Sequence, residues 1–395
     1  MSIAKEVKFK MYTRNCPVCE SNKSEVLFSN PDYRYIDAWG INYKAPLRYL
    51  ICENCTHIYK NPNIDPLQMR NMYSRLIIEP INDKENESQR LKMHYESFVE
   101  LTEDFFRELK TPISMIEIGC GNAELLNKIY NKFSTKISSI KGIEPSLELG
   151  RQLKERVNFE FENIFFDQLD LSKKYDFIIL DNVFEHFDFP HDELSRLRKL
   201  VSDTGYLYIS IPDISFAIRG FVDMFAGHPS NYVIENFKLL MDKAGFYVEK
   251  YDYKYKWLNC LIRLKKASDK TEEFNFHKIK GDLVREMQSK LKSNNELLFK
   301  LKNIIKREVE LLKSTNGKML IFGAGDHTQE LMTHIDFKNT VIGLIDNNAF
   351  YHGKTRLNLK VYSLSQLKEL HFDKILISSQ SFHQDIKANI LTLEF

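Results

Sequence analysis

The chain has 395 residues, too many for one ordinary hydrophobic core, and a norm of about 150 residues per domain favours two or three domains. Its 56 Lys and Arg residues nearly balance its 54 Asp and Glu residues, for a net charge of +2. This balance excludes the strongly basic charge of a dedicated nucleic-acid-binding protein. Hydrophobic residues make up 43% of the chain and aromatic residues 12%, which excludes a chain that is disordered throughout.

The sequence contains no apolar run that approaches the roughly 18 residues of a membrane-spanning helix. Its first residues are partly basic, but no apolar stretch follows them, so neither a signal peptide nor a transmembrane anchor is visible. We therefore expect a soluble cytoplasmic protein whose partner is neither a membrane nor a nucleic acid. The oligomeric state is not determined by these features.

Four of the six cysteines form two CxxC pairs, CPVC and CENC, near the N-terminus. Each CxxC turn places two thiolates on one side of an ion, so two turns complete the tetrahedral shell of zinc. Disulfides are the alternative, but they rarely persist in the reducing compartment expected for a chain without an export signal. We predict a structural zinc module over residues 1–70 and expect His57, which could replace one thiolate, to be a surface residue instead. The predicted ligands are Cys16, Cys19, Cys52 and Cys55.

The region after this module carries two kinds of hydrophobic pattern. Residues 66–110 are mostly polar with apolar residues at helical spacing, which predicts one or two amphipathic helices. Residues 112–265 alternate apolar strands such as ISMIEIG and YDFIILD with helical patterns, which is typical of an α/β layer with a largely parallel sheet. We assign residues 71–265 to one α/β domain that includes the N-terminal helices.

Residues 266–316 are predicted to form a helical linker before a second, small α/β unit over residues 317–395. Between Lys254 and Lys313, sixteen basic residues face eight acidic ones, and apolar residues recur at spacings of three, four and seven. One interpretation is a long solvated helix with one buried stripe. The other is a basic face that helps to hold a phosphorylated substrate.

A glycine turn lies between an apolar strand and a helix near residue 120. Gly119 and Gly121 let the backbone approach a ligand that would clash with a Cβ atom, and the helix N-terminus behind them favours an anionic group. Glu117 precedes the turn, where its carboxylate could accept a hydrogen bond from an ammonium group. Glu144 ends the next strand, 23 residues after Gly121, at the edge where a doubly wound sheet binds a ribose diol.

The segments IEIGCGNA, GIEPS and YDFIILDNVFEHF together resemble the class I S-adenosylmethionine-dependent methyltransferases over about residues 85–255, with Ala123 where a third glycine often stands. The resemblance implies a doubly wound Rossmann-like core whose glycine turn lines the methionine part of S-adenosylmethionine. It also implies that Glu144 binds the ribose, that Asn163 and Ile164 lie near the adenine, and that Asp181 and Asn182 edge the pocket. The expected cofactor-binding residues are Glu117, Gly119, Gly121, Glu144, Asn163, Ile164, Asp181 and Asn182.

The order of a cysteine module, a methyltransferase core and a C-terminal Rossmann-like unit also resembles the sugar C-methyltransferases that act on nucleotide-linked keto sugars. In that family an Asn-Val motif with a following histidine comes after the fourth strand, as at His186 here, and a later segment carries Glu-His, where this chain has Gly227 and His228. The resemblance implies His186 and His228 as catalytic residues, and histidine suits proton transfer near neutral pH. Helix capping or packing is the alternative for His186, and Glu185 is expected at the solvated rim of the pocket.

The C-terminal unit has a second glycine turn, with Gly323 and Gly325 after the strand KMLIF and Asp346 at the end of the next strand. This imitates a dinucleotide fingerprint, but Thr328 replaces the third glycine and the unit has about half the size of a full dinucleotide fold. We therefore do not expect bound NAD. The resemblance implies that Gly323, Gly325 and His327 lie near the phosphate of a nucleotide-sugar substrate, and a packing or dimerisation domain is the alternative.

These features together predict an S-adenosylmethionine-dependent methyltransferase of a nucleotide-activated or phosphorylated sugar, with a histidine general base and a structural zinc ion. The architecture favours methylation of carbon over oxygen, and Gly227 weakens that preference. Two alternatives stay open. One is an N- or O-methyltransferase of a small non-sugar or carrier-bound acceptor, and the other is a cofactor-binding scaffold without turnover.

Overall fold

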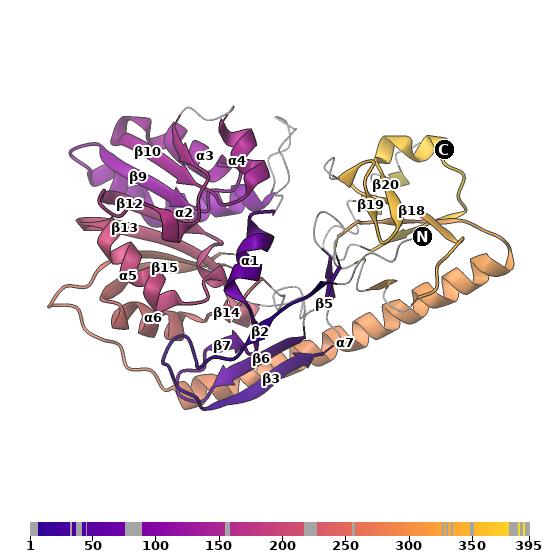
Figure 1. Ribbon diagram of the computed structural model, residues 1–395, viewed down its shortest axis with the longest axis horizontal. Coiled ribbons are helices and arrows are strands. Elements are labelled where there is room, and N and C mark those ends of the chain that lie inside the picture. The colour runs from indigo at the N-terminus through magenta and orange to yellow at the C-terminus, as the bar shows by residue number, and fades with distance from the viewer. Residues whose placement is uncertain are drawn as a thin grey trace.

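The structure is a computed structural model with an N-terminal module, a central α/β domain, one long helix and a small C-terminal α/β unit (Figure 1). The residues that it describes are 7–31, 34–36, 42–44, 46–75, 89–154, 159–216, 227–254, 257–325, 328, 331–332, 335–347, 351–378, 386–387 and 390–391. Among these residues, no helix combines the length and apolar character needed to cross a membrane.

A seven-stranded sheet forms the centre of the α/β domain, in the order β11-β10-β9-β12-β13-β16-β15. The five strands from β11 to β13 are parallel, whereas β16 pairs antiparallel with both β13 and β15. The expected largely parallel α/β sheet is thereby confirmed. The strands are β9 (Ile113–Ile118), β10 (Ile137–Ile143), β11 (Glu160–Glu162), β12 (Tyr175–Asp181), β13 (Val201–Pro212), β15 (Phe246–Lys254) and β16 (Trp257–Leu264).

Helices cover both faces of this sheet because alternate strand residues are buried on opposite sides. Phe177 and Ile179 of β12 join the cluster that packs against α2 and α3, whereas Ile178 and Leu180 join the cluster that packs against α5 and α6. The amphipathic pattern in residues 66–110 forms α1 and α2. The helices are α1 (Pro66–Tyr73), α2 (Gln89–Glu108), α3 (Glu124–Phe133), α4 (Leu147–Lys154), α5 (Pro190–Leu200) and α6 (Ile234–Lys243), with short 3₁₀ turns η1 (Ser134–Lys136), η2 (Phe166–Gln168), η3 (Phe184–His186) and η4 (Ile214–Phe216).

The N-terminal module, which we call the cysteine module, is built from short strands of residues 7–64. Its main sheet has the order β14-β7-β6-β3, and β14 (Ser230–Asn231) comes from the α/β domain, where it pairs antiparallel with β7 (Ile58–Lys60). The cysteine module is therefore joined to the α/β domain by backbone hydrogen bonds and is not a separate appendage. Its other strands are β1 (Val7–Lys8), β2 (Met11–Tyr12), β3 (Ser24–Asn30), β4 (Arg34–Ile36), β5 (Asn42–Lys44), β6 (Leu47–Cys52) and β8 (Asn63–Ile64).

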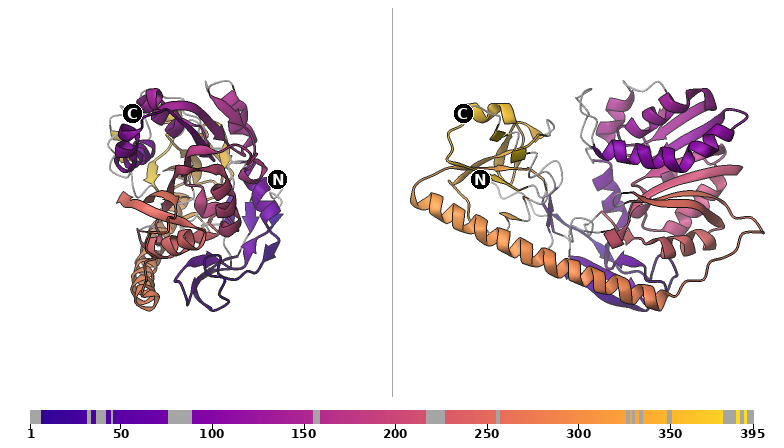
Figure 2. Two further views of the ribbon diagram at one scale, coloured as in Figure 1. Left: turned by 90° about the vertical axis from the view of Figure 1, so that its left-hand side faces the viewer. Right: turned by 180° about the vertical axis from the view of Figure 1, so that it is seen from behind.

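One long helix, α7 (Phe276–Ser314), connects the α/β domain to the C-terminal unit (Figure 2). Leu283 and Met287 near its start pack against the cysteine module, whereas Ile305 and Val309 near its end pack in the core of the C-terminal unit. The helix therefore has a separate buried face at each end. The expected long connecting helix with a buried stripe stays a prediction for the middle of α7, where Leu291 and Leu298 lie outside the described side chains.

The C-terminal unit is a five-stranded sheet in the order β19-β20-β18-β17-β21. The strand after the long helix, β17, lies between β18 and β21 and is parallel to both. The C-terminal residues therefore form a sheet of their own, separate from the sheet of the α/β domain. The elements are β17 (Met319–Phe322), β18 (Val341–Ile345), β19 (Thr355–Arg356), β20 (Leu359–Tyr362), β21 (Lys374–Ile377) and the 3₁₀ turn η6 (Leu364–Glu369).

Candidate functional site

The glycine turn between β9 and α3 is held by the carboxylate that ends the next strand. The Gly121 N–H donates to Glu144 Oε2 at 3.0 Å, and the Ser146 N–H donates to Glu144 Oε1 at 2.9 Å. Gly119 has a φ angle of +69°, and a Cβ atom there would lie 2.6 Å from Cγ2 of Val183. Both the backbone conformation and the close approach of the segment after β12 therefore require glycine at 119.

Three carboxylates gather at the carboxyl ends of neighbouring strands β9, β10 and β12. Glu117 is 2% exposed, and its Oε2 atom has no hydrogen-bond partner among the described residues. Burial raises the pKa of Glu117 well above its usual range, and the charges of Asp181 and Glu144 raise it further. Burial also raises the pKa of Glu144, against the opposite effect of its two backbone hydrogen bonds. A buried acceptor within a negative cluster suits a cationic ligand group such as an ammonium.

Asn163 supports the loop that contains Glu144. Its Nδ2 atom donates to the backbone oxygens of Glu144 at 2.6 Å and of Ser146 at 2.9 Å. A Cβ atom at Gly150 would lie 2.5 Å from Asn163 Cγ, so this side chain also packs closely against α4. The amide nitrogen of Asn163 is thus engaged by the backbone, and Ile164 packs against the core. Their expected place near an adenine ring stays a prediction.

Two residues that the sequence analysis missed, His94 and Trp257, complete a network at the end of β12. His94 Nδ1 lies 2.7 Å from Asp181 Oδ1, and Asn182 Nδ2 donates to the same oxygen at 3.1 Å. The Trp257 indole N–H donates to Asn182 Oδ1 at 2.8 Å, and its ring meets the His94 ring edge-on at a centroid distance of 4.3 Å. His94 lies in the apolar stripe of α2, three residues after Leu91. A polar residue within an apolar stripe is the sequence feature that could have identified it.

His186 and His228 come together although they are distant in the sequence. Their ring centroids are 4.9 Å apart. His186 Nδ1 lies 2.8 Å from Gly227 O and 2.8 Å from the hydroxyl of Tyr73. Because a carbonyl oxygen only accepts, the hydrogen bond to Gly227 places the proton of the neutral ring on Nδ1, so Nε2 is the basic nitrogen.

Glu185 is buried and is not at a solvated rim, which corrects the expectation from the sequence. It is 2% exposed, and its Oε1 atom lies 3.9 Å from His228 Nε2. The 3₁₀ turn η3 accounts for this position, because it packs Phe184 against Phe237 and turns the following residue toward the loop of His228. The cluster of Glu185, His186 and His228 brings one side-chain oxygen or nitrogen of each residue within 4.8 Å of the others.

The cysteine module forms the wall behind His228. The Tyr49 hydroxyl of β6 donates to His228 O at 2.6 Å, and the Lys60 N–H of β7 donates to Pro229 O at 2.9 Å. The Arg14 guanidinium donates to the same Pro229 oxygen. These bonds fix the backbone carbonyls of residues 228 and 229, so the position of His228 depends on the cysteine module.

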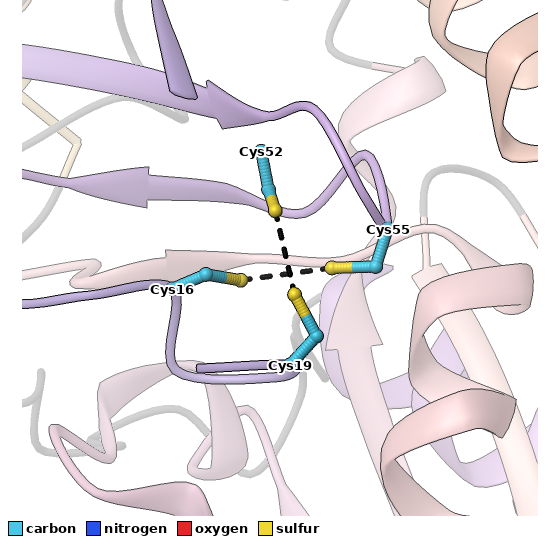
Figure 3. A group of neighbouring side chains, drawn as sticks. All are labelled: Cys16, Cys19, Cys52 and Cys55. Carbon is cyan, nitrogen blue, oxygen red and sulfur yellow. Dashed lines mark hydrogen bonds between the residues drawn. The ribbon is translucent and has the colours of Figure 1, made fainter. Parts of the chain in front are cut away.

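The four predicted cysteines converge on one point (Figure 3). All four Sγ atoms lie within 4.8 Å of one another, with 3.6 Å between Cys16 and Cys55 and 3.4 Å between Cys19 and Cys52. Tetrahedral zinc with Zn–S bonds of about 2.3 Å separates its sulfur ligands by about 3.8 Å, so the cluster fits such an ion. A disulfide requires about 2.05 Å between sulfurs, and all four thiols are free.

The two CxxC turns have the same backbone design. The Cys16 N–H donates to Ser21 O and the Cys52 N–H donates to His57 O, each at 2.9 Å. His57 is fully buried and contacts the rings of Tyr59 and Tyr232, so the expectation of a surface histidine was wrong. Burial lowers its pKa to about 3, which keeps the ring neutral within the aromatic packing.

The C-terminal unit repeats the geometry of the first glycine turn. The Ala324 N–H donates to Asp346 Oδ2 at 2.7 Å, as the Gly121 N–H donates to Glu144. Gly323 has a φ angle of +110°, and a Cβ atom at Gly325 would meet no atom of the described residues within 4 Å. His327 lies outside the described residues, so its expected place near a phosphate stays a prediction.

Two family models match separate parts of the chain. One, described as a methyltransferase domain, matches residues 90–251, and the other, described as C2185-like, N-terminal, matches residues 315–395. No curated protein matches the sequence. The first match contains the glycine turn, Glu144 and the segment from Asp181 to His186, and the second contains the turn at Gly323.

Several solved methyltransferase structures resemble the α/β domain. The plantazolicin methyltransferase BpumL in complex with SAH is 16% identical, with a TM-score of 0.38, and the match covers 45% of this chain and 84% of BpumL. The ribosomal protein L11 methylase of Lactobacillus delbrueckii subsp. bulgaricus is 13% identical, with a TM-score of 0.33 and coverages of 46% and 81%. An S-adenosylmethionine-dependent methyltransferase of Clostridium acetobutylicum is 11% identical, with a TM-score of 0.37 and coverages of 45% and 92%. At TM-scores below 0.5 these likenesses identify neither a substrate nor a methylated atom.

Proposed function

We propose that this S-adenosylmethionine-dependent methyltransferase methylates a nucleotide-activated or phosphorylated sugar. Its methyltransferase domain includes residues 90–251, which the family model matches. The observation that carries the substrate class is the repeated turn geometry. Gly121 with Glu144 and Ala324 with Asp346 each join a turn N–H to the carboxylate that ends the next strand. One such site serves the adenosyl group of the cofactor, and the second suits another nucleotide.

The C-terminal unit approaches the α/β domain near the residues proposed to bind the cofactor. The pKa of Glu148, at the start of α4, is lowered first by its hydrogen bond from Arg151 and also by the charge of Lys354 in the C-terminal unit. Because α4 directly follows the loop of Glu144, the C-terminal unit lies on the side of the α/β domain that carries the cofactor residues. This arrangement supports a substrate held between the two units.

The residues of the first site fit the cofactor. The Glu117 Oε2 atom, which has no hydrogen-bond partner among the described residues, suits the ammonium group in the methionine part of the cofactor. Each carboxylate oxygen of Glu144 accepts one backbone hydrogen bond and retains a lone pair for a ribose hydroxyl. The bound cofactor supplies an electrophilic methyl group on a positively charged sulfur. The buried carboxylates of Glu117, Glu144 and Asp181 favour that positive charge before transfer.

The histidine pair supplies the base that either acceptor needs. Methylation of carbon requires removal of a proton beside a carbonyl, whereas methylation of oxygen requires only that a hydroxyl proton be accepted. His228 is held by Tyr49 at its backbone, and His186 presents Nε2 as its basic nitrogen. We propose that His228 accepts the proton from the acceptor and that His186 assists it. Much of the remaining rate enhancement comes from alignment of donor and acceptor and from exclusion of water by the cysteine module.

We also propose that the four cysteines hold one structural zinc ion. Four thiolates close the shell, so no coordination position is left for a substrate, and the ion would stabilise the turns on which the wall behind His228 depends.

Replacing Glu144 by alanine tests the first site. The variant loses a charge-assisted hydrogen bond to the ribose, so the affinity for S-adenosylmethionine is expected to fall by roughly 1 to 3 kcal/mol. Isothermal titration calorimetry measures the change. Glu148→Ala, at the half-buried start of α4, is the matched control and should bind normally. Unchanged affinity in the Glu144 variant would contradict this placement of the pocket.

Incubation with a panel of nucleotide sugars in heavy water tests the overall proposal. Mass spectrometry is expected to find a methylated sugar, and a carbon acceptor should also exchange its acidic hydrogen for deuterium. Methylation of oxygen without exchange would exclude the carbon reaction. Turnover with only a peptide or another non-sugar acceptor would contradict the substrate class, and cofactor binding without any product would favour a scaffold.

A further inference from the structure

The buried carboxylate of Glu185 is the feature that the sequence pattern leaves without a role. Glu185 is 2% exposed and His228 is 8% exposed, so both side chains are largely withdrawn from water. Glu185 Oε1 lies 3.9 Å from His228 Nε2. At this distance the two groups interact as charges and not through a direct hydrogen bond.

A buried carboxylate is costly unless a positive group compensates it. His186 and His228 are the groups that share its cluster. The Arg14 guanidinium also lies in this region, but it donates to the backbone oxygens of Asp188 and Pro229. Among the described residues, His228 is the ionisable residue with a side-chain nitrogen within 4.0 Å of a Glu185 oxygen.

Other titratable groups surround the pair. The hydroxyls of Tyr73 from α1 and Tyr49 from β6 bind Gly227 O and His228 O, and Lys60 of β7 holds Pro229 through its backbone. Burial raises the pKa of Tyr232, and the charge of Glu185 contributes to that shift. In the part of the chain that the structure describes, the charged or titratable groups around the site, apart from the tyrosines, are Glu185, the two histidines, Lys60, Arg14 and Asp188, which interacts with Lys60 and Arg14.

We infer that Glu185 is the positioning carboxylate of His228: it orients the imidazole and stabilises its protonated form during methyl transfer. This rests on the proposed function for its chemistry, and it goes further by naming the carboxylate. The chain has Gly227 directly before the histidine, where no side chain is available. The carboxylate is supplied instead by η3, from the end of β12.

The step balances as an ordinary proton transfer. With Nε2 on the side of Glu185, Nδ1 of His228 accepts the proton from the acceptor carbon or hydroxyl. The released electron pair attacks the methyl carbon, and the bond between that carbon and sulfur breaks with its electrons left on sulfur. The imidazolium that results is positive beside a negative carboxylate, which lowers the energy of the charge-separated state.

Glu185→Gln is the decisive variant because it keeps the size of the side chain and removes the charge. We expect kcat to fall by about 10-fold or more with KM nearly unchanged. The carboxylate favours the protonated imidazole, so its removal lowers the pKa of His228. The base is active when deprotonated, and the acidic limb of the kcat/KM profile should therefore move to lower pH.

An NMR titration of the His228 ring gives a second readout that needs no substrate. Its pKa should fall in Glu185→Gln and stay near the wild-type value in Glu185→Asp, which keeps the charge. Glu193→Gln is the matched control, since it removes another partly buried carboxylate on α5 that lies outside the cluster, and it should leave the His228 titration unchanged. If no sugar is methylated, the proposed function is contradicted. The NMR titration of His228 still tests its pairing with Glu185.

An unchanged His228 pKa in a folded Glu185→Gln protein overturns the inference. If that variant unfolds, Glu185→Asp decides, and a His228 pKa that falls although the charge is retained also overturns it. Activity that is lost on removal of a divalent ion other than zinc, and restored by added Mn²⁺, would show that the three residues hold a metal. That result overturns the pairing as well.

Discussion

Replacement of His228 by alanine is expected to lower kcat by about 100-fold or more while the affinity for S-adenosylmethionine stays nearly unchanged. The large effect follows from the loss of the base, because a proton must leave the acceptor as the methyl group arrives. The fold should survive, since Tyr49 and Lys60 hold the backbone oxygens of residues 228 and 229, which alanine retains. Steady-state kinetics and calorimetry on the same preparation separate the two quantities.

His277→Ala is the control for this experiment, because His277 is exposed near the start of α7 and distant in sequence from the cluster. It should turn over normally. His186→Ala is expected to share part of the loss if the two rings act together. A His228→Ala enzyme with normal turnover on its true substrate would remove this residue from the mechanism.

Loss of the zinc ion is expected to have the largest effect on stability. Protein purified without chelator should contain one zinc per chain, and Cys16→Ser combined with Cys52→Ser should lose it, with about 10 kcal/mol or more of metal binding at stake. Metal analysis and thermal unfolding measure both results. Cys260→Ala removes a buried thiol of β16 and should retain the metal. Absence of zinc from the wild type, or unchanged folding of the double variant, would contradict the assignment.

This loss should also reach the active site. Cys16, Cys52 and Cys55 belong to the same hydrophobic cluster as Phe184 and Phe237 of the α/β domain, and β14 carries the backbone just after His228 into the sheet of the cysteine module. The cysteine turns and the loop of His228 are therefore expected to unfold together, and not one before the other.

The parts of the fold that the sequence predicted are those encoded by local pattern. The strands β9 and β12 follow from largely apolar runs, and the pairing of Gly121 with Glu144 follows from a turn and a strand end that adjoin in a parallel sheet. The convergence of the cysteines follows from the chemistry of two CxxC turns. In each case a short local motif marks the residues that come into contact.

The remainder depends on contacts between distant segments. The pairing of β14 with β7 joins residues more than 170 positions apart, and its two residues carry no strand pattern of their own. The burial of Glu185 depends on how η3 packs against the loop of His228, and the bond between Trp257 and Asn182 spans 75 positions. No local periodicity encodes such contacts. Glu185, a charged residue that follows a strand, was therefore interpreted as solvated.

The long helix α7 acts as a spacer of defined length. Its 39 residues span about 58 Å at about 1.5 Å per residue, and between Met287 and Leu301 none of its described side chains joins either core. On the proposed function, the number of residues in α7 determines the distance between the turn at Gly121 and the turn at Gly323. This distance does not depend on the conformation of either turn. A change in the length of the accepted substrate would require added or deleted helical turns, so specificity for substrate length can evolve separately from specificity for the nucleotide.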